Sequence, residues 1–235
     1  MKTAKKTLLL ALAAVMLVSA TVMGTVAYLT SQSSVQNTFT IGKVAIEVNE
    51  KKVNPDGVPM ENYGRVKSNE YRLLPGQTYV KDPTMFIKEG SELAYVRMIV
   101  KINEQVDLDA IFKKYNDKIT DESKKLSMVN IFDGYDSSFW QLVKETEVDP
   151  YNRTYEFRYH TTVKGPDYDT NGGELWTELK PLFTGFTIPG FFTSEDLESI
   201  QNLVIDIEGH AIQAASFQDA DEAWAAFQSQ YNGQI

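Results

Sequence analysis

Alternation of apolar and polar residues at every second position dominates the chain after about residue 27. It is clearest at Leu93–Ile102, where Ala94, Val96 and Met98 share one face, and at Thr154–Val163, where aromatic residues alternate with charged ones. Successive side chains of a strand point to opposite faces, so such runs predict strands with one apolar side. The same reading predicts further strands at Thr78–Ile87, Leu182–Ile188 and Asn202–Ile212.

Helical spacing is confined to two short stretches. Asp107 is the predicted cap of the first, which carries Leu108, Ile111, Phe112 and Tyr115. The second is predicted over Asp219–Gln228, with Asp219 and Glu222 spaced as a capping box. Its apolar stripe consists of Ala220, Ala223, Trp224 and Phe227. The prediction is a mainly β protein: an antiparallel, jelly-roll-like β-sandwich over residues 42–235 with short peripheral helices, one of them C-terminal.

Residues 28–41 form a separate strand-forming arm in this reading. Their odd positions hold the apolar residues Leu29, Val35, Phe39 and Ile41. At Gly42 the pattern changes register, so that the apolar positions become Val44, Ile46 and Val48, and a change at glycine indicates a bulge or a break. The arm has two options: it folds back on its own sheet, or it pairs with the exposed sheet edge of a neighbouring copy.

The first 27 residues have the layout of a signal peptide. Lys2, Lys5 and Lys6 precede an apolar stretch from Leu8 to Val22, and small residues then lead to Ala27. This order predicts export and cleavage between Ala27 and Tyr28. An uncleaved membrane anchor is the alternative. After cleavage, contact with the membrane would end.

Charge and cysteine content narrow the possible partners. The chain has 23 Lys and Arg against 32 Asp and Glu, and removal of the first 27 residues would leave 20 against 32. A chain with this excess of negative charge is repelled by nucleic acid and by anionic lipid. The absence of cysteine excludes disulfides, a thiol nucleophile and a cysteine-type zinc site.

Several short motifs, in order, resemble the TasA/camelysin family of exported matrix proteins. The first is the junction Gly24-Thr25-Val26-Ala27-Tyr28-Leu29-Thr30-Ser31, followed by Asn37-Thr38-Phe39-Thr40-Ile41-Gly42-Lys43-Val44. The next are Leu74-Pro75-Gly76-Gln77 and Ala94-Tyr95-Val96-Arg97. The last are Pro181-Leu182-Phe183-Thr184, Ala211-Ile212-Gln213-Ala214, Phe217 and Ala223-Trp224. The insertions at Asn49–Asn69 and Lys113–Leu126 depart from the family's minimal pattern.

The resemblance implies a jelly-roll subunit of biofilm matrix fibres. It implies export through a dedicated signal peptidase, SipW, and an N-terminal arm that completes the sheet of the next subunit. Leu29, Val35, Phe39 and Ile41 would then be the assembly residues. Because some relatives carry a metalloendopeptidase name, a secreted or surface metalloendopeptidase is the second hypothesis for the function. A membrane-retained adhesin is the third.

The residues themselves offer little catalytic chemistry. Only His160 and His210 are present, without an H-E-x-x-H helix, and we interpret both as surface or edge histidines. No G-x-S-x-G elbow or phosphate-binding glycine loop occurs. Asp167, Asp169, Asn171, Gly172 and Glu178 match calcium-loop spacing. Because Pro166 and Pro181 exclude the flanking helices, we interpret this segment as an acidic loop. We expect no metal, no cofactor and no catalytic residue.

Overall fold

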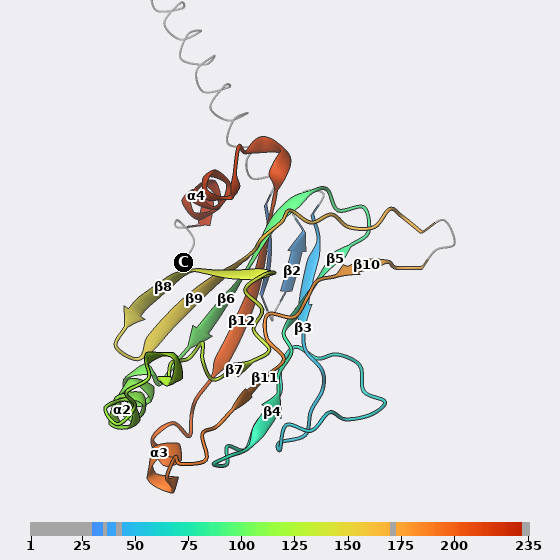
Figure 1. Cartoon of the computed structure of the whole chain (residues 1–235). Helices are drawn as coiled ribbons and strands as arrows, with labels where there is room; N and C mark the ends of the chain where they lie inside the picture. Colours follow the sequence, from blue (N-terminus) through green and yellow to red (C-terminus); the bar gives the residue numbers. More distant parts are fainter. Residues whose placement is uncertain (1–29, 35–36, 41–43, 170–172, 232–235) are drawn as a thin grey trace, which may run out of the picture.

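A computed structural model describes residues 30–34, 37–40, 44–169 and 173–231. Its largest sheet has the order β2-β1-β12-β6-β9-β8, formed by Asn37–Thr40, Thr30–Ser34, Ile205–Gln213, Ala94–Ile102, Asn152–Tyr159 and Trp140–Asp149. A second sheet has the order β10-β5-β3, formed by Trp176–Glu178, Thr84–Lys88 and Ile46–Asn49. The third is β4-β11-β7, formed by Thr78–Val80, Gly185–Thr187 and Phe132–Asp133. Figure 1 shows all three.

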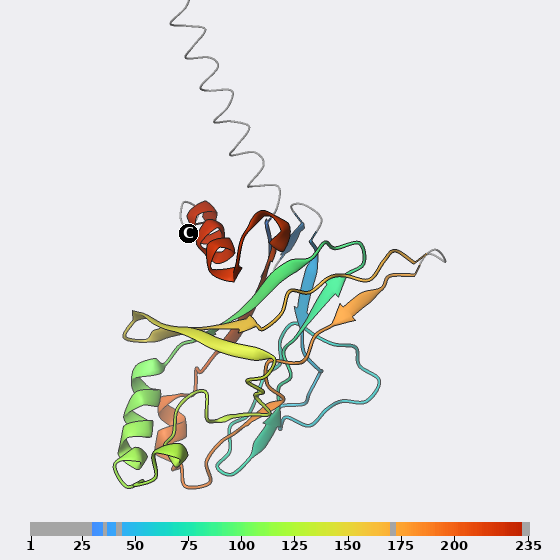
Figure 2. The ribbon, with the colours of Figure 1, turned by 45° about the horizontal axis from the view of Figure 1, so that its top comes forward.

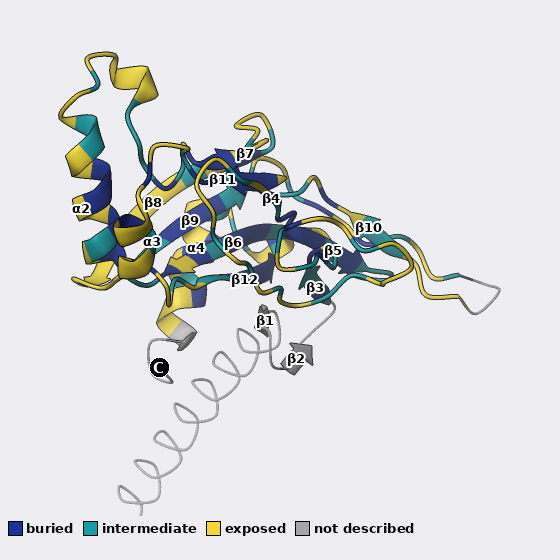
Figure 3. Cartoon of the chain, turned by 90° about the horizontal axis from the view of Figure 1, so that it is seen from below, coloured by how far each residue is buried: buried dark blue, intermediate teal, exposed yellow. Residues whose placement is uncertain are grey.

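The three sheets share one apolar core. Met98 of β6, Met85 of β5 and Phe186 of β11 all belong to it. The large sheet lies close to β3 at Gly209 of β12, because a Cβ atom there would lie 2.4 Å from Cγ2 of Val48. In Figure 3 the burial colours follow this arrangement, with β6 and β5 mostly buried. The prediction of a mainly β, antiparallel fold is therefore confirmed, whereas the jelly-roll connectivity stays a prediction.

Within the described residues, three α-helices lie outside the sheets. α2 (Gln105–Asn116) and α3 (Ser194–Ser199) lie beside each other at one end of the molecule (Figure 2), where Lys114 donates to Asp196 at 2.8 Å. α4 (Ala220–Tyr231) lies on the outer face of the large sheet. Short 3-10 turns occur at Glu122–Lys124 and Ala214–Ser216.

The predicted C-terminal helix is confirmed, and so is its apolar stripe. Ala223, Trp224 and Phe227 are buried and pack on Ile212 of β12. Only half of the predicted capping box forms: Asp219 accepts from the amide of Glu222 at 2.9 Å, but the Glu222 carboxylate accepts from the amide of Gln218. Helix α4 is thus a cover over one end of the large sheet.

Two predicted elements need correction. Asp107 does not cap α2; it lies in the first turn, and the helix begins after Glu104, whose backbone is left-handed (φ 53°). The predicted strand Thr78–Ile87 is divided between two sheets, because Pro83 has no amide to donate and Lys81 and Asp82 are held by buried ion pairs. Strand β8 was not predicted at all.

Strand β8 forms one end of the large sheet. It pairs with β9 on one side, and the register shifts between Leu142 and Lys144 and again between Glu147 and Asp149. Most of its side chains are exposed, including Val143 and Val148. Charged residues and irregular pairing are the usual means by which a sheet edge resists further pairing.

The arm is described in part, and it is a hairpin rather than one strand. β1 and β2 pair antiparallel, with Ser33 opposite Thr38 and Gln32 opposite Phe39. β1 also pairs with β12, with Ser33 opposite Gly209 and Gln32 opposite His210. In the single chain the arm is therefore part of its own sheet.

Candidate functional site

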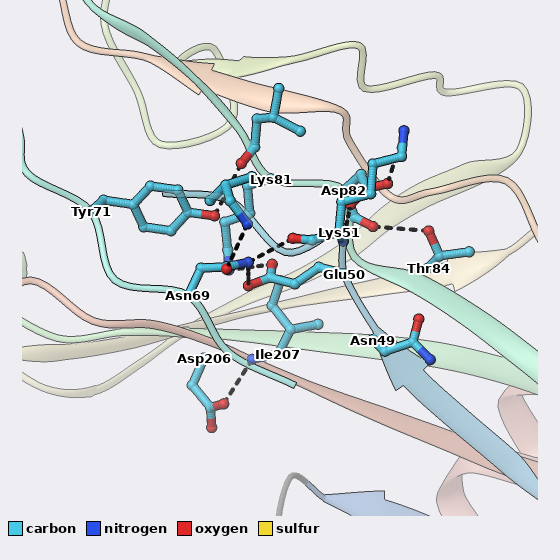
Figure 4. Close-up of polar contacts among 12 residues, drawn as sticks. Asn49, Glu50, Lys51, Asn69, Tyr71, Lys81, Asp82, Thr84, Asp206 and Ile207 are labelled. Atoms are coloured by element: carbon cyan, nitrogen blue, oxygen red, sulfur yellow. Dashed lines mark hydrogen bonds and ion pairs between the residues drawn. The ribbon is translucent and has the colours of Figure 1, made fainter. Parts of the chain in front are cut away.

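The stretch Ile205–Glu208 of β12 is paired on one side only among the described residues. β6 pairs with β12 along its whole length, whereas β1 pairs with Gly209–Ile212 alone. The amide of Ile207 donates instead to the carboxylate of the neighbouring Asp206 at 3.0 Å, as Figure 4 shows. An unpaired strand edge can pair with another extended chain. In the single chain, the Asp206 carboxylate accepts the Ile207 amide hydrogen that such a chain would otherwise bond.

A pocket of about 510 Å³ lies beside this edge. It opens between β12 and the end of β3, which is itself the last strand of its sheet. Its apolar lining includes Val48, Leu73, Phe186, Ile200, Leu203 and Ile205. Since large apolar surfaces are normally covered in a folded protein, such a pocket is suited to receive apolar side chains.

One wall of the pocket is charged and buried. Nζ of Lys81 donates to Oε2 of Glu50 at 2.8 Å, and the two residues are only 7% and 4% exposed. Asn69 donates to the other Glu50 oxygen at 3.0 Å and to the carbonyl of Lys51 at 2.8 Å. Figure 4 shows these side chains turned toward one another. The charges of Lys81 and Glu50 therefore cancel within this wall.

Tyr71 closes the same wall. Its hydroxyl donates to the carbonyl of Val80 at 3.1 Å, and its ring lies edge-on against those of Tyr79 and Phe186. Burial, and then the negative charge of Glu50, raises the pKa of Tyr71 far above its ordinary value. Tyr71 therefore acts as a neutral donor and a packing surface, not as a base.

A second polar network surrounds Asp82, which lies in the chain between the lining residues Lys81 and Pro83. Arg65 donates to Thr84 at 2.7 Å and to the carbonyl of Asp82 at 2.9 Å, and it pairs with the Asp82 carboxylate at 3.2 Å. These bonds tie the polar loop 50–69 to the beginning of β5. The pocket wall is thus held in place before any occupant binds, which lowers the ordering cost of binding.

Most of the predicted arm residues cannot be placed. Ala27, Tyr28, Leu29, Val35 and Ile41 lie outside the described residues, and Phe39 lies in β2. The pocket was not predicted, because its lining combines residues from five separate parts of the sequence. The only local signal was the apolar pair Tyr71 and Leu73 after the polar loop.

The interpretation of His210 was wrong. It is 6% exposed, because α4 covers it, and its ring stacks on Phe227 with centroids 4.9 Å apart. Its Nδ1 accepts from Nε of Arg97 at 3.1 Å, and the guanidinium lies 4.3 Å from the centre of the Trp224 ring. His160 is exposed, as predicted, with Nε2 2.8 Å from the carbonyl of Ser137.

The structure leaves the calcium-loop pattern largely undescribed. Asn171 and Gly172 lie outside the described residues, and Glu178 lies in β10 opposite Phe86. The Asp169 carboxylate accepts from the amide of Gly173 at 3.0 Å. Within the described ranges no group of three or more His, Asp or Glu side chains is placed to hold a metal ion.

Comparison with family models, with curated proteins and with solved structures found no match for this chain. In the part of the chain that the structure describes, none of the helices combines the length and apolarity needed to cross a membrane.

Proposed function

We propose that this protein is an exported structural subunit, of the biofilm-matrix-fibre kind, that assembles with copies of itself outside the cell. The observation that carries the proposal is the unpaired stretch Ile205–Glu208 lying beside an apolar pocket. An extended peptide adds to such an edge through main-chain hydrogen bonds, while alternate side chains enter the pocket. The apolar alternation of the arm, with Leu29, Val35, Phe39 and Ile41, supplies a peptide of that kind.

The energetics favour slow, concentration-dependent assembly. Each buried side chain of the size of Val or Phe contributes about 1.5–3 kcal/mol. Each ordered backbone residue costs about 1–2 kcal/mol. Four apolar side chains therefore do not offset the ordering of the 28–41 arm by burial alone, and backbone pairing must supply the rest. Association is head-to-tail, because arm and edge are different surfaces of one subunit.

Deletion of residues 28–37 from the chain that begins at Tyr28 should leave a folded monomer that forms no fibres. The deletion removes β1 and part of the arm but none of the pocket. Sedimentation and electron microscopy measure assembly, and circular dichroism confirms the fold. Fibre formation by the shortened chain at the rate of the full one would refute the role of the arm.

Export by a dedicated signal peptidase gives a second test. N-terminal sequencing of the protein recovered from the culture medium should begin at Tyr28, because small residues lead to Ala27. A protein that keeps Met1 and stays with the membrane would instead support the adhesin reading.

A further inference from the structure

Lys81, Glu50 and Asn69 form a chain of three polar groups in the wall of the pocket. Nζ of Lys81 donates to Oε2 of Glu50 at 2.8 Å, and Nδ2 of Asn69 donates to Oε1 of the same carboxylate at 3.0 Å. One carboxylate thus holds an amine and a carboxamide next to each other, as Figure 4 shows. An ion pair needs no third member, whereas this set contains a nucleophile, an electrophile and a group that can carry protons between them.

The carboxamide of Asn69 is polarised at both ends. Its Oδ1 accepts from the backbone amide of Val53 at 3.0 Å, and its Nδ2 donates to the carbonyl of Lys51 at 2.8 Å as well as to Glu50. Attack on Cγ would place negative charge on Oδ1, which the Val53 amide would stabilise in the manner of an oxyanion hole. The two acceptors at Nδ2 would stabilise the positive charge of a departing nitrogen.

Burial prepares the amine for attack. Lys81 and Glu50 are both buried, and Nζ lies 5.9 Å from the centre of the Tyr71 ring, which packs edge-on against Phe186. Loss of water disfavours the charged pair relative to the neutral one. Transfer of a proton from the Lys81 ammonium to the Glu50 carboxylate therefore costs less here than in water, and it leaves Nζ as a nucleophilic amine.

We infer that Lys81 and Asn69 join in an intramolecular isopeptide bond, with Glu50 as the catalytic residue. The bond between Nζ and Cγ forms, and the bond between Cγ and Nδ2 breaks. Nζ gives up two protons, which Glu50 transfers through its two oxygens to the departing nitrogen. That nitrogen leaves as ammonium through the pocket that the three residues line, and the Glu50 carboxylate is restored. Nothing is oxidised or reduced, so the reaction needs only the folded chain.

The bond would tie the end of the polar loop 50–69 to the segment between β4 and β5. It would fix this wall of the pocket covalently, which a chain without cysteine cannot achieve with a disulfide. The ion pair between Lys81 and Glu50 is the state before the reaction. The unreacted chain is therefore the reference for variants that probe that pair.

Mass spectrometry of the full chain tests the inference. The folded protein should be lighter than its sequence by about 17 Da, the mass of ammonia. Trypsin should release the peptide 68–72 joined to the peptide 73–88, because Lys81 in an isopeptide bond is no longer a cleavage site. The joined peptide distinguishes this reaction from loss of ammonia at another asparagine, such as Asn171 or Asn232, each of which precedes glycine.

Variants of the three residues test their roles. Lys81→Arg keeps a positive charge beside Glu50 but has no nucleophilic amine, so it should fold and give no joined peptide. Glu50→Gln should slow the joining at least about 100-fold, as loss of a general acid-base group does. Lys88→Arg, which changes the exposed lysine beside Glu174, is the matched control and should join like the wild type.

Two results would overturn the inference. The first is separate recovery of the peptides 68–72 and 73–81 from wild-type chain that circular dichroism shows to be folded. The second is joining in Glu50→Gln as fast as in the wild type. Wild-type chain kept in urea should remain unjoined, because only the fold brings Asn69 and Lys81 to one carboxylate.

Discussion

Lowering the pH from 7 to 4 should destabilise the fold by about 3 kcal/mol through His210 alone, if its folded pKa is about 3. Burial beneath α4 lowers this pKa most, and the positive charges of Arg97 and Lys101 lower it further. The unfolded chain binds a proton near the ordinary pKa of about 6.5. Below that pH it binds more protons than the folded chain, so stability present at neutral pH is lost as the pH falls toward 3.

The charges around His210 do not reverse this sign. Glu208 of the same strand lies 3.8 Å from Nε2. On the neighbouring strands Glu156 pairs with Arg97 at 3.3 Å and with Arg158 at 2.7 Å, and Arg158 also pairs with Asp221 of α4. The carboxylates are thus shared with other cations, and Trp224 and Phe227 exclude water from the ring.

Urea unfolding between pH 7 and pH 4 measures this effect. His210→Gln should remove most of the slope over that range, whereas the exposed His160→Gln should leave it unchanged. Burial opposes the shift of the Asp196 pKa, but its bonds to Lys114 and Thr193 lower it, so Asp196 contributes a separate loss that begins near pH 5 and falls mostly below about pH 4. An unaltered slope in His210→Gln would contradict the assignment.

Lys81→Met should cost about 3–5 kcal/mol, because it leaves the Glu50 carboxylate buried without its counter-charge. Asn69 alone would then bond to it. The double variant Glu50→Gln/Lys81→Met should recover most of the loss, since no charge then remains buried and Gln keeps an acceptor for Asn69. The result would show that the pocket wall depends on charge pairing rather than on a specific cation.

Lys88→Met is the matched control for this experiment. Lys88 and Glu174 form an ion pair of the same length, 2.8 Å, but their side chains are 36% and 66% exposed. Exposed pairs contribute about 0–1 kcal/mol, so this variant should stay near the wild type in denaturant unfolding. A loss of less than about 1 kcal/mol in Lys81→Met as well would mean that Glu50 takes up a proton or reaches water.

The strands that the sequence predicted best are those with one face in the core. Met98 and Val100 of β6 and Phe157 of β9 are buried, as their alternation indicates. The sequence does not predict strand β8, because it is the end strand of its sheet and most of its side chains are exposed, which removes the period-two signal. Period-two alternation in the sequence therefore predicts strands that contact the core. It does not predict strands that have little contact with the core.

Tertiary contacts account for the other differences. The break at Lys81 depends on Glu50, thirty-one positions away, and the burial of His210 depends on a helix that follows it in the chain. The pocket likewise arises only when Leu73, Phe186 and Ile205 come together. Neither composition nor spacing contains these distances, so the pocket could not be predicted from the sequence.

The irregular strand β8 has a consequence for the shape of any polymer. The large sheet has two ends; β8 resists pairing through its register shifts and charged side chains, and the other end carries the hairpin. In the proposed assembly each subunit donates one arm and receives one, which makes it a bifunctional monomer. Bifunctional monomers grow into unbranched threads whose mean length rises with concentration. Branches or sheets would require a third connecting surface. The irregular, charged edge of β8 does not provide one.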